Sequence, residues 1–237
     1  MQAHERLINA HRAAQEGRHD FALREFVWFH DNALAENPAL YGVRLSFALG
    51  YWHELGQSYP SALQELRRVR DAKTALLSAG SGTRDLFDDV AAINMELGEV
   101  NVTVALFEEL HAKQPHLAVE CSRLVRSQLV ATGKFELASK YLSNPDAHVR
   151  DICRTLVEDV ANIDDQAESA ALSRQAYVDN SANEVGLVCS ILRGIGELDE
   201  AQRLELLAKS LIDSATLRED FDASFQGLGD RSCNIAR

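Results

Sequence analysis

Apolar residues recur along most of this chain at the spacing of an α-helix. One stripe, with positions three or four residues apart, is formed by Ala22, Phe26, Phe29 and Ala33. A second stripe, much later in the chain, is formed by Ala201, Leu204, Ala208, Leu211 and Ala215. Such spacing places side chains on one helical face. No segment shows the sustained alternation or the bounded β-branched clusters of a strand, so the pattern predicts an all-α protein.

A short phrase separates the helical stretches. It consists of a glycine, a charged residue, two or three further residues, and then an alanine followed by a long side chain. Clear and looser copies begin at Gly17, Gly56, Gly98, Gly133 and Gly196. Because helices commonly end on a glycine in the left-handed conformation, each copy predicts the turn of a helix hairpin. The long step before Gly196 predicts one unmarked turn near Ile163 to Gln166.

The cysteines supply a second period of similar length. Cys121, Cys153 and Cys189 each begin a Cys-x-x-Leu phrase. Together the two periods predict an α-solenoid of about six antiparallel helix hairpins in one domain over residues 1–218. The hairpins are expected at roughly 2–38, 39–80, 84–115, 116–145, 146–180 and 183–215. Residues 219–237 are expected to form a polar, loosely ordered tail.

The turn phrase, with a proline near the end of the second helix, resembles the tetratricopeptide repeat (TPR). Ala22 and Phe26 match the Ala-x-x-x-Phe pattern of that family's second helix. Ala105 with Glu109 departs from it, and the first-helix signature of Trp, Leu-Gly and Tyr is nearly absent. The resemblance implies a diverged TPR-like superhelix with an extended concave surface. Sel1-type, HEAT-like and other helical-hairpin arrays remain alternatives.

The net charge of the chain limits the kinds of partner that we expect. The chain has 24 Lys and Arg against 36 Asp and Glu, a formal net charge of −12 at pH 7. That field repels phosphate backbones, so we expect no nucleic-acid partner, and it speeds encounter with a basic protein. The chain has no apolar run of about 18 residues and its first residues do not resemble a secretory signal. We therefore expect a cytoplasmic protein with no membrane contact.

The motifs of catalysis and metal binding are incomplete. His53 and Glu54 begin like a zinc-protease motif, but Gln57 stands where the second histidine belongs. The cysteines form no Cys-x-x-Cys pair. We therefore expect no enzyme, cofactor or metal site. An enzyme on a helical scaffold, the alternative, would need His30 or His53 to meet Glu54 or Asp31 in a cleft.

Aromatic residues are concentrated in the first two expected hairpins, where nine lie between Phe21 and Tyr59. Trp, Tyr and Arg dominate binding hot spots. We predict a mixed aromatic and charged partner-binding surface here, with acidic residues that steer the partner; a well-packed aromatic core is the alternative. The candidate partner-binding residues are Trp28, Tyr41, Arg44, Tyr51, Trp52, Glu54, Asp85, Asp88 and Asp89.

These expectations combine into a non-enzymatic protein-binding module. The chain is similar to small acidic helical-repeat proteins of bacteria that neutralise toxins, so the specific hypothesis is an immunity protein that binds a cognate, basic toxin. The alternative is a regulatory, adaptor or chaperone protein that binds a peptide in its concave groove. Both rest on analogy, because a fold alone does not determine function.

Overall fold

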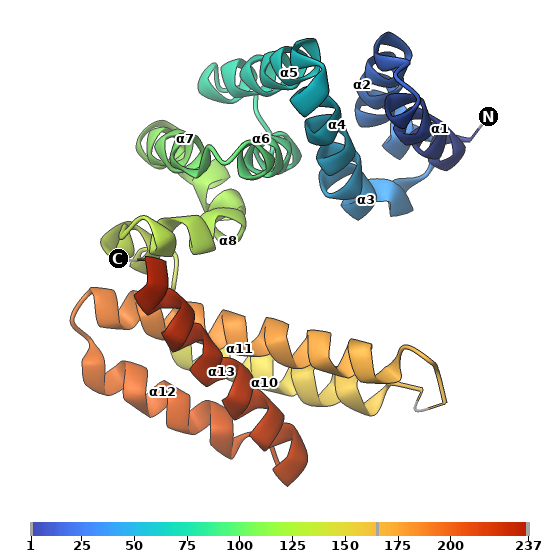
Figure 1. Cartoon of the computed structure of the whole chain (residues 1–237). Helices are drawn as coiled ribbons and strands as arrows, with labels where there is room; N and C mark the ends of the chain where they lie inside the picture. The colour runs from blue at the N-terminus through green and yellow to red at the C-terminus, as the bar shows by residue number, and fades with distance from the viewer. Residues whose placement is uncertain (1, 165, 236–237) are drawn as a thin grey trace. The chain divides into compact units, whose positions relative to one another are not determined.

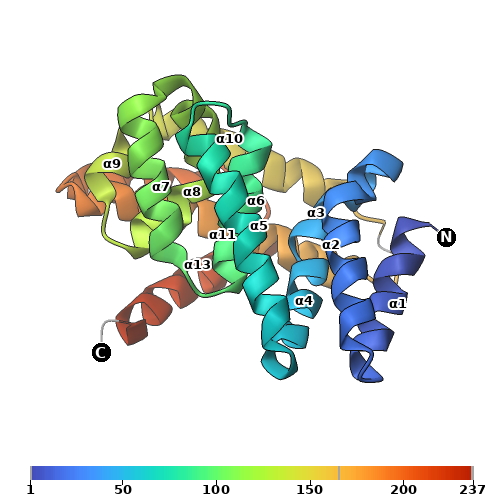
Figure 2. The same ribbon diagram turned by 90° about the horizontal axis from the view of Figure 1, so that it is seen from above.

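The computed structural model describes residues 2–164 and 166–235, with side chains as far as residue 227 (Figure 1, Figure 2). The described chain is 83% helical and contains no strand, which confirms the all-α prediction. None of its helices is long and apolar enough to cross a membrane. The chain forms two compact units, residues 1–128 and 129–237, where we expected one domain over 1–218. They are called unit 1 and unit 2 below.

Unit 1 consists of helices that pack mostly against their neighbours in sequence. They are α1 (Ala3–Gln15), α2 (His19–Glu36), a 3-10 turn (Pro38–Leu40), α3 (Tyr41–Leu45), α4 (Phe47–Ser58), α5 (Pro60–Ser78), α6 (Arg84–Glu96), α7 (Val100–Lys113) and α8 (Pro115–Ala131), which continues past the unit boundary. The pairs α1/α2, α4/α5 and α6/α7 occupy the ranges of the first three expected hairpins.

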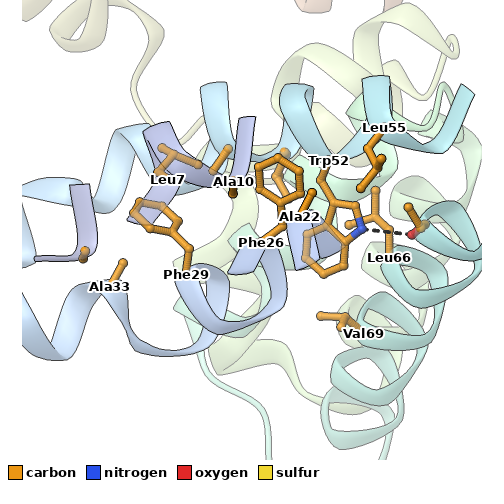
Figure 3. Packing of buried hydrophobic residues seen from close by; sticks show 14 of the residues in the cluster. Leu7, Ala10, Ala22, Phe26, Phe29, Ala33, Trp52, Leu55, Leu66 and Val69 are labelled. Carbon is orange, nitrogen blue, oxygen red and sulfur yellow. Dashed lines mark hydrogen bonds between the residues drawn. The ribbon is translucent and has the colours of Figure 1, made fainter. Parts of the chain in front are cut away.

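The core of unit 1 forms where the predicted apolar stripes meet (Figure 3). Phe26 and Phe29 of α2 are buried beside Trp52 of α4, and Leu66 of α5 closes the same cluster. The indole N–H of Trp52 donates to the Ala62 carbonyl at 2.9 Å, so its one polar atom is satisfied inside the core.

Unit 2 is organised around one long helix. Its helices are α9 (Phe135–Ser139), α10 (Pro145–Ala161), α11 (Ala170–Gly194), α12 (Leu198–Ser210) and α13 (Ala215–Ile235). Helix α11 packs against α9, α10, α12 and α13. We expected a break between hairpins at residues 180–183, but α11 continues through them. Val178, Ala182 and Val185 are buried on one continuous stripe, and no glycine or proline interrupts it there.

The C-terminal segment also differs from the expected loose tail. Residues 219–235 belong to α13. Phe221 is buried in the unit 2 core, and its ring lies 6.0 Å from that of Phe225. These two aromatic side chains hold the segment against α11 and its neighbours. Residues 236–237 lie outside the described residues.

The glycine turns share one geometry. Gly17, Gly98, Gly133 and Gly196 all have positive φ, between 70° and 88°, at the end of a helix, and they are confirmed as turns. The residue after each glycine donates its N–H to the carbonyl five positions earlier, at 2.7–2.9 Å. This is the Schellman cap, which favours glycine because left-handed backbone crowds a Cβ. Gly80, which we did not assign to this series, forms the same cap.

The phrase that begins at Gly56 does contain a turn, but Gly56 is not the residue that forms it. Gly56 lies inside α4 and is buried, and the chain turns later, at Tyr59. A Cβ at Gly56 would lie 2.3 Å from Cγ of Leu63, so its glycine permits close packing of α4 and α5. The expected unmarked turn does fall between Ala161 and Ala170, although residue 165 lies outside the described residues.

Candidate functional site

An open groove of about 830 Å³ lies between the outward faces of α2 and α5 in unit 1. Its lining residues form one stripe on each helix: Leu23, Arg24, Val27, Trp28, Asp31 and Asn32 on α2, and Ser61, Gln64, Glu65 and Arg68 on α5. Steps of three and four residues place each set on a single helical face. Apolar side chains and both signs of charge therefore meet in one concave surface.

The groove exists because α2 and α5 share a neighbour. Both pack against α4, which lies between them (Figure 1). Their inward faces enter the same core, with Phe26 and Phe29 from α2 and Leu66 and Val69 from α5 (Figure 3). Their outward faces have no third helix between them, and the space remains open.

Trp28 is held in place at this groove. The guanidinium carbon of Arg6 lies 3.6 Å from the centroid of the Trp28 ring, a cation–π contact. Glu25 accepts two hydrogen bonds from Arg6, at 2.6 and 2.9 Å, and this pairing raises the pKa of Arg6. The Asn32 side chain donates to the Trp28 carbonyl at 2.8 Å. The contact with Arg6, which is itself paired with Glu25, therefore restrains the half-buried indole.

A second cluster is a buried ionic network. Arg44 of α3 donates to Asp89 of α6, and Lys73 of α5 donates to the other carboxylate oxygen at 2.6 Å. Burial raises the pKa of Asp89, but the hydrogen bonds from Arg44 and Lys73 outweigh it, and the net shift is downward. Arg44 and Asp89 are each only 4% exposed. They join helices and are not available to a partner, which corrects the prediction for both.

His30 of α2 completes the network from the inside. Its carbonyl accepts from Arg44 at 3.3 Å, and its Nε2 lies 3.4 Å from the same guanidinium. Burial, reinforced by the nearby Arg44 charge, lowers the pKa of His30 to about 3. A neutral histidine is therefore enclosed among two cations and one carboxylate.

Tyr41 and the other α6 carboxylates lie at the edge of this network. The Tyr41 hydroxyl donates to Asp88 at 2.5 Å. Burial, and then this bond, raise the pKa of Tyr41. Asp85 remains exposed, 3.7 Å from Arg84. Tyr41 and Asp88 thus tie α3 to α6, and of these three predicted residues Asp85 is the most exposed.

The three predicted residues of α4 lie in two different environments. Tyr51 and Glu54 are at the surface, and Trp52 is in the core. Tyr51 stacks on His11 of α1, with ring centroids 3.8 Å apart and an interplanar angle of 7°. Glu54 lies 3.6 Å from His11, so this trio connects α1 to α4 at the surface. Trp52 is 1% exposed. It is a core residue, which corrects its prediction as a partner contact.

Among the nine candidates, Trp28 lines the groove. The other lining residues were missed, although the sequence carries a trace of them. Leu23 and Val27 form a second apolar stripe on α2, beside the buried one. Both side chains are half-buried against the unit 1 core, and their remaining exposed surface borders the groove.

The histidines considered for catalysis have other neighbours. His53 Nδ1 lies 3.0 Å from Glu96, and its Nε2 lies 3.0 Å from Gln57. His30 lies 4.0 Å from Asp89. Across residues 2–164 and 166–227 no three His, Cys, Asp or Glu side chains come together as a metal site would require.

Comparisons with protein-family models, with curated proteins and with solved structures found no match. The candidate site therefore rests on its own geometry.

Proposed function

We propose that this chain is a non-enzymatic protein-binding module whose α2–α5 groove receives a segment of another protein. The open groove of about 830 Å³, with a preorganised tryptophan, carries the proposal. Rigid aromatic side chains in concave sites are typical binding anchors because little conformational entropy is lost when they are covered.

We further propose that unit 1 is a TPR-like array. Its sequential packing and the repeated Schellman caps support this, since helical-repeat proteins use such turns between units that each contact their neighbours. Such arrays bind their partners along extended concave surfaces. The α2–α5 groove lies between the first two helix pairs.

The specific role that we propose is that of a bacterial immunity protein that neutralises a basic toxin by direct binding. The net charge of −12 supports a basic partner through faster encounter. An adaptor, chaperone or regulator that binds a peptide in the groove is the second candidate. The mixed charge of the groove lining favours it, because that lining suits a polar peptide as well as a strongly basic one.

Site-specific photocrosslinking in the native host tests the binding function. A benzophenone amino acid replaces exposed Gln64 in the groove, and a matched variant carries it at exposed Gln202 on α12. We expect a discrete protein adduct from position 64 that is absent from position 202 and is weakened by Trp28→Ala. Equal adducts from both positions, or none from position 64, would contradict the proposal.

The captured protein then separates the two roles. An immunity protein requires a partner that arrests growth when expressed alone and is harmless when this chain is co-expressed. A partner that is harmless alone contradicts the immunity role and leaves the adaptor role. Added salt should slow association with a basic partner more than it speeds dissociation.

A further inference from the structure

The charges of the groove are unevenly paired. Arg68 donates to Glu65 at 2.8 and 2.5 Å, and the Asp31 carboxylate also attracts it. One arginine therefore faces two carboxylates. Arg24, on the same α2 stripe as Asp31, has no hydrogen bond or ion pair within the described part of the chain. Within the described residues, this exposed cation beside Leu23, Val27 and Trp28 has no direct ion-pair partner.

The dimensions of the groove match a short helix. Its lining runs from Leu23 to Asn32 on α2, and nine steps at about 1.5 Å each give a length of about 13 Å. Two helical turns, about 11 Å long, fit within this length.

Backbone hydrogen bonding also favours a helix. Both walls are helices that present side chains, so they offer no strand edge to an extended peptide. A helix satisfies its own N–H and C=O groups internally and needs only side-chain contacts from the groove.

We propose that the α2–α5 groove receives about two turns of an amphipathic helix from a partner protein. The apolar side chains of that helix contact Leu23, Val27 and Trp28, and one of its carboxylates pairs with Arg24. This inference rests on the proposed protein-binding function and specifies the chemistry of its contact.

A local carboxylate is compatible with a basic partner. Residues 129–237 carry 19 Asp and Glu against 11 Lys and Arg, and residues 1–128 carry 17 against 13. The overall negative charge acts on approach, over about a Debye length. The Arg24 contact acts after docking, where it selects among helices that present the same apolar face.

Display selection tests the inference while the partner is unidentified. A library randomises one face of a twelve-residue helix on a rigid helical scaffold, and the full-length chain is the target. We expect the selected helices to carry Asp or Glu at one position and apolar residues three or four and seven positions away. Arg24→Glu should weaken the best of them at least about tenfold, since a charge-assisted hydrogen bond becomes a repulsion.

The matched control is Arg123→Glu, a charge reversal at an exposed arginine of α8 outside the groove. It should change affinity less than about twofold, because the site is distant and screened. Exchange of the peptide carboxylate for lysine should restore binding to the Arg24→Glu variant. Circular dichroism melting of both variants checks that the fold is retained.

The inference is overturned if no helix is selected, if the selected helices lack the acidic position, or if their binding ignores Arg24→Glu. If position 64 still crosslinks a cellular protein in those cases, the protein-binding function is supported. The proposal that an acidic amphipathic helix fills the groove is then contradicted. If helices are selected as expected but position 64 crosslinks nothing in the host, the groove chemistry stands and the proposed cellular function fails.

Discussion

The two units bury different chemistry. All ten buried polar or charged side chains within the described residues belong to unit 1, among them Arg44, Asp89, Arg70 and Asn94. The buried side chains described in unit 2 are aliphatic or aromatic, together with Cys153 and Cys189. Both units are all-helical, so secondary structure does not account for the difference.

This difference bears on how strictly each core defines the arrangement of its helices, which is a separate matter from how much stability burial provides. A buried ion pair contributes little net stability, because its attraction only offsets the desolvation of both charges, yet loss of one partner is costly. The unit 1 network joins α2, α3, α5 and α6, and we expect it to disfavour arrangements that would separate its charges. An apolar core such as that of unit 2 accepts many volume-conserving substitutions. We therefore expect unit 1, which carries the groove, to tolerate fewer changes in helix packing than unit 2.

Removal of Asp89 should produce the largest effect. Asp89→Ala leaves Arg44 buried without a counter-charge and Lys73 without its acceptor, and should lower the free energy of unfolding by about 3–5 kcal/mol. Chemical denaturation with hydrogen exchange followed by mass spectrometry locates the loss in unit 1. The control is Asp146→Ala in unit 2, whose pairs with Arg150 and Arg203 are exposed; we expect no resolvable change there.

Replacement of the whole network sharpens the comparison. The triple variant Arg44→Leu, Lys73→Met and Asp89→Leu removes every charge of the network together, and should recover much of the stability lost in Asp89→Ala. A triple variant less stable than the single one would show that the network contributes favourable energy beyond its own desolvation.

Mild acid should weaken unit 1 through His30. The folded state holds its pKa near 3, whereas its ordinary value is 6.5. Below pH 6.5 the unfolded chain binds a proton that the folded chain does not. The contribution of neutral His30 to the free energy of unfolding is therefore fully present above pH 6.5. It falls by about 1.4 kcal/mol per pH unit between pH 6.5 and about pH 3. Hydrogen exchange of α2 between pH 7 and 5, corrected for intrinsic rates, measures this slope. An unchanged slope in His30→Gln would contradict the assignment to His30.

A close helix contact in unit 2 should respond to one methyl group. A Cβ at Gly194 of α11 would lie 2.0 Å from Cγ of Phe135 on α9, so Gly194→Ala should cost about 1–3 kcal/mol by overpacking. Gly194→Ala combined with Phe135→Leu should cost less than the sum of the single changes. Additive losses in thermal melts would show that the two residues do not interact. Gly56→Ala provides the equivalent test at Leu63 in unit 1.

The smallest expected effect is on the rate at which buried cysteine thiols of unit 2 react with a maleimide. Burial raises the pKa of the Cys153 and Cys189 thiols to about 11, so both should react slowly with a maleimide in the native protein. A Cys233→Ser background is used because that side chain lies outside the described residues. Labelling followed by peptide mass spectrometry then reports the opening of unit 2. Rapid labelling at pH 7 would contradict the buried apolar core.

Local features of the fold could be predicted from sequence, and long-range ones could not. Gly17 and Gly196 were recognisable as turns because a Schellman cap depends on a few adjacent residues. Gly56 has the same sequence context, but its role is set by Leu63 on the next helix. The continuity of α11 depends on four helices that pack around it, and spacing alone favoured a break there.

The same limit applies to the site. Trp28 could be predicted because it is one of the aromatic residues concentrated in the first two expected hairpins. Trp52 has the same residue type, but it points into the core that α4 shares with α5. Arg44 and Asp89 are 45 positions apart, so no local pattern reveals their pairing. The groove depends on the separation of α2 and α5, a distance that α4 determines.

The central position of α11 also has a consequence for synthesis on the ribosome. Helix pairs of unit 1 contact their sequence neighbours, so each pair can form as it emerges and can then support the next one. Unit 2 completes its core only when α13 has been made, because Phe221 packs into the same cluster as Val178 and Cys189 of α11. Until then the apolar stripe of α11 is incompletely covered, and chaperones would recognise the nascent chain at this stage.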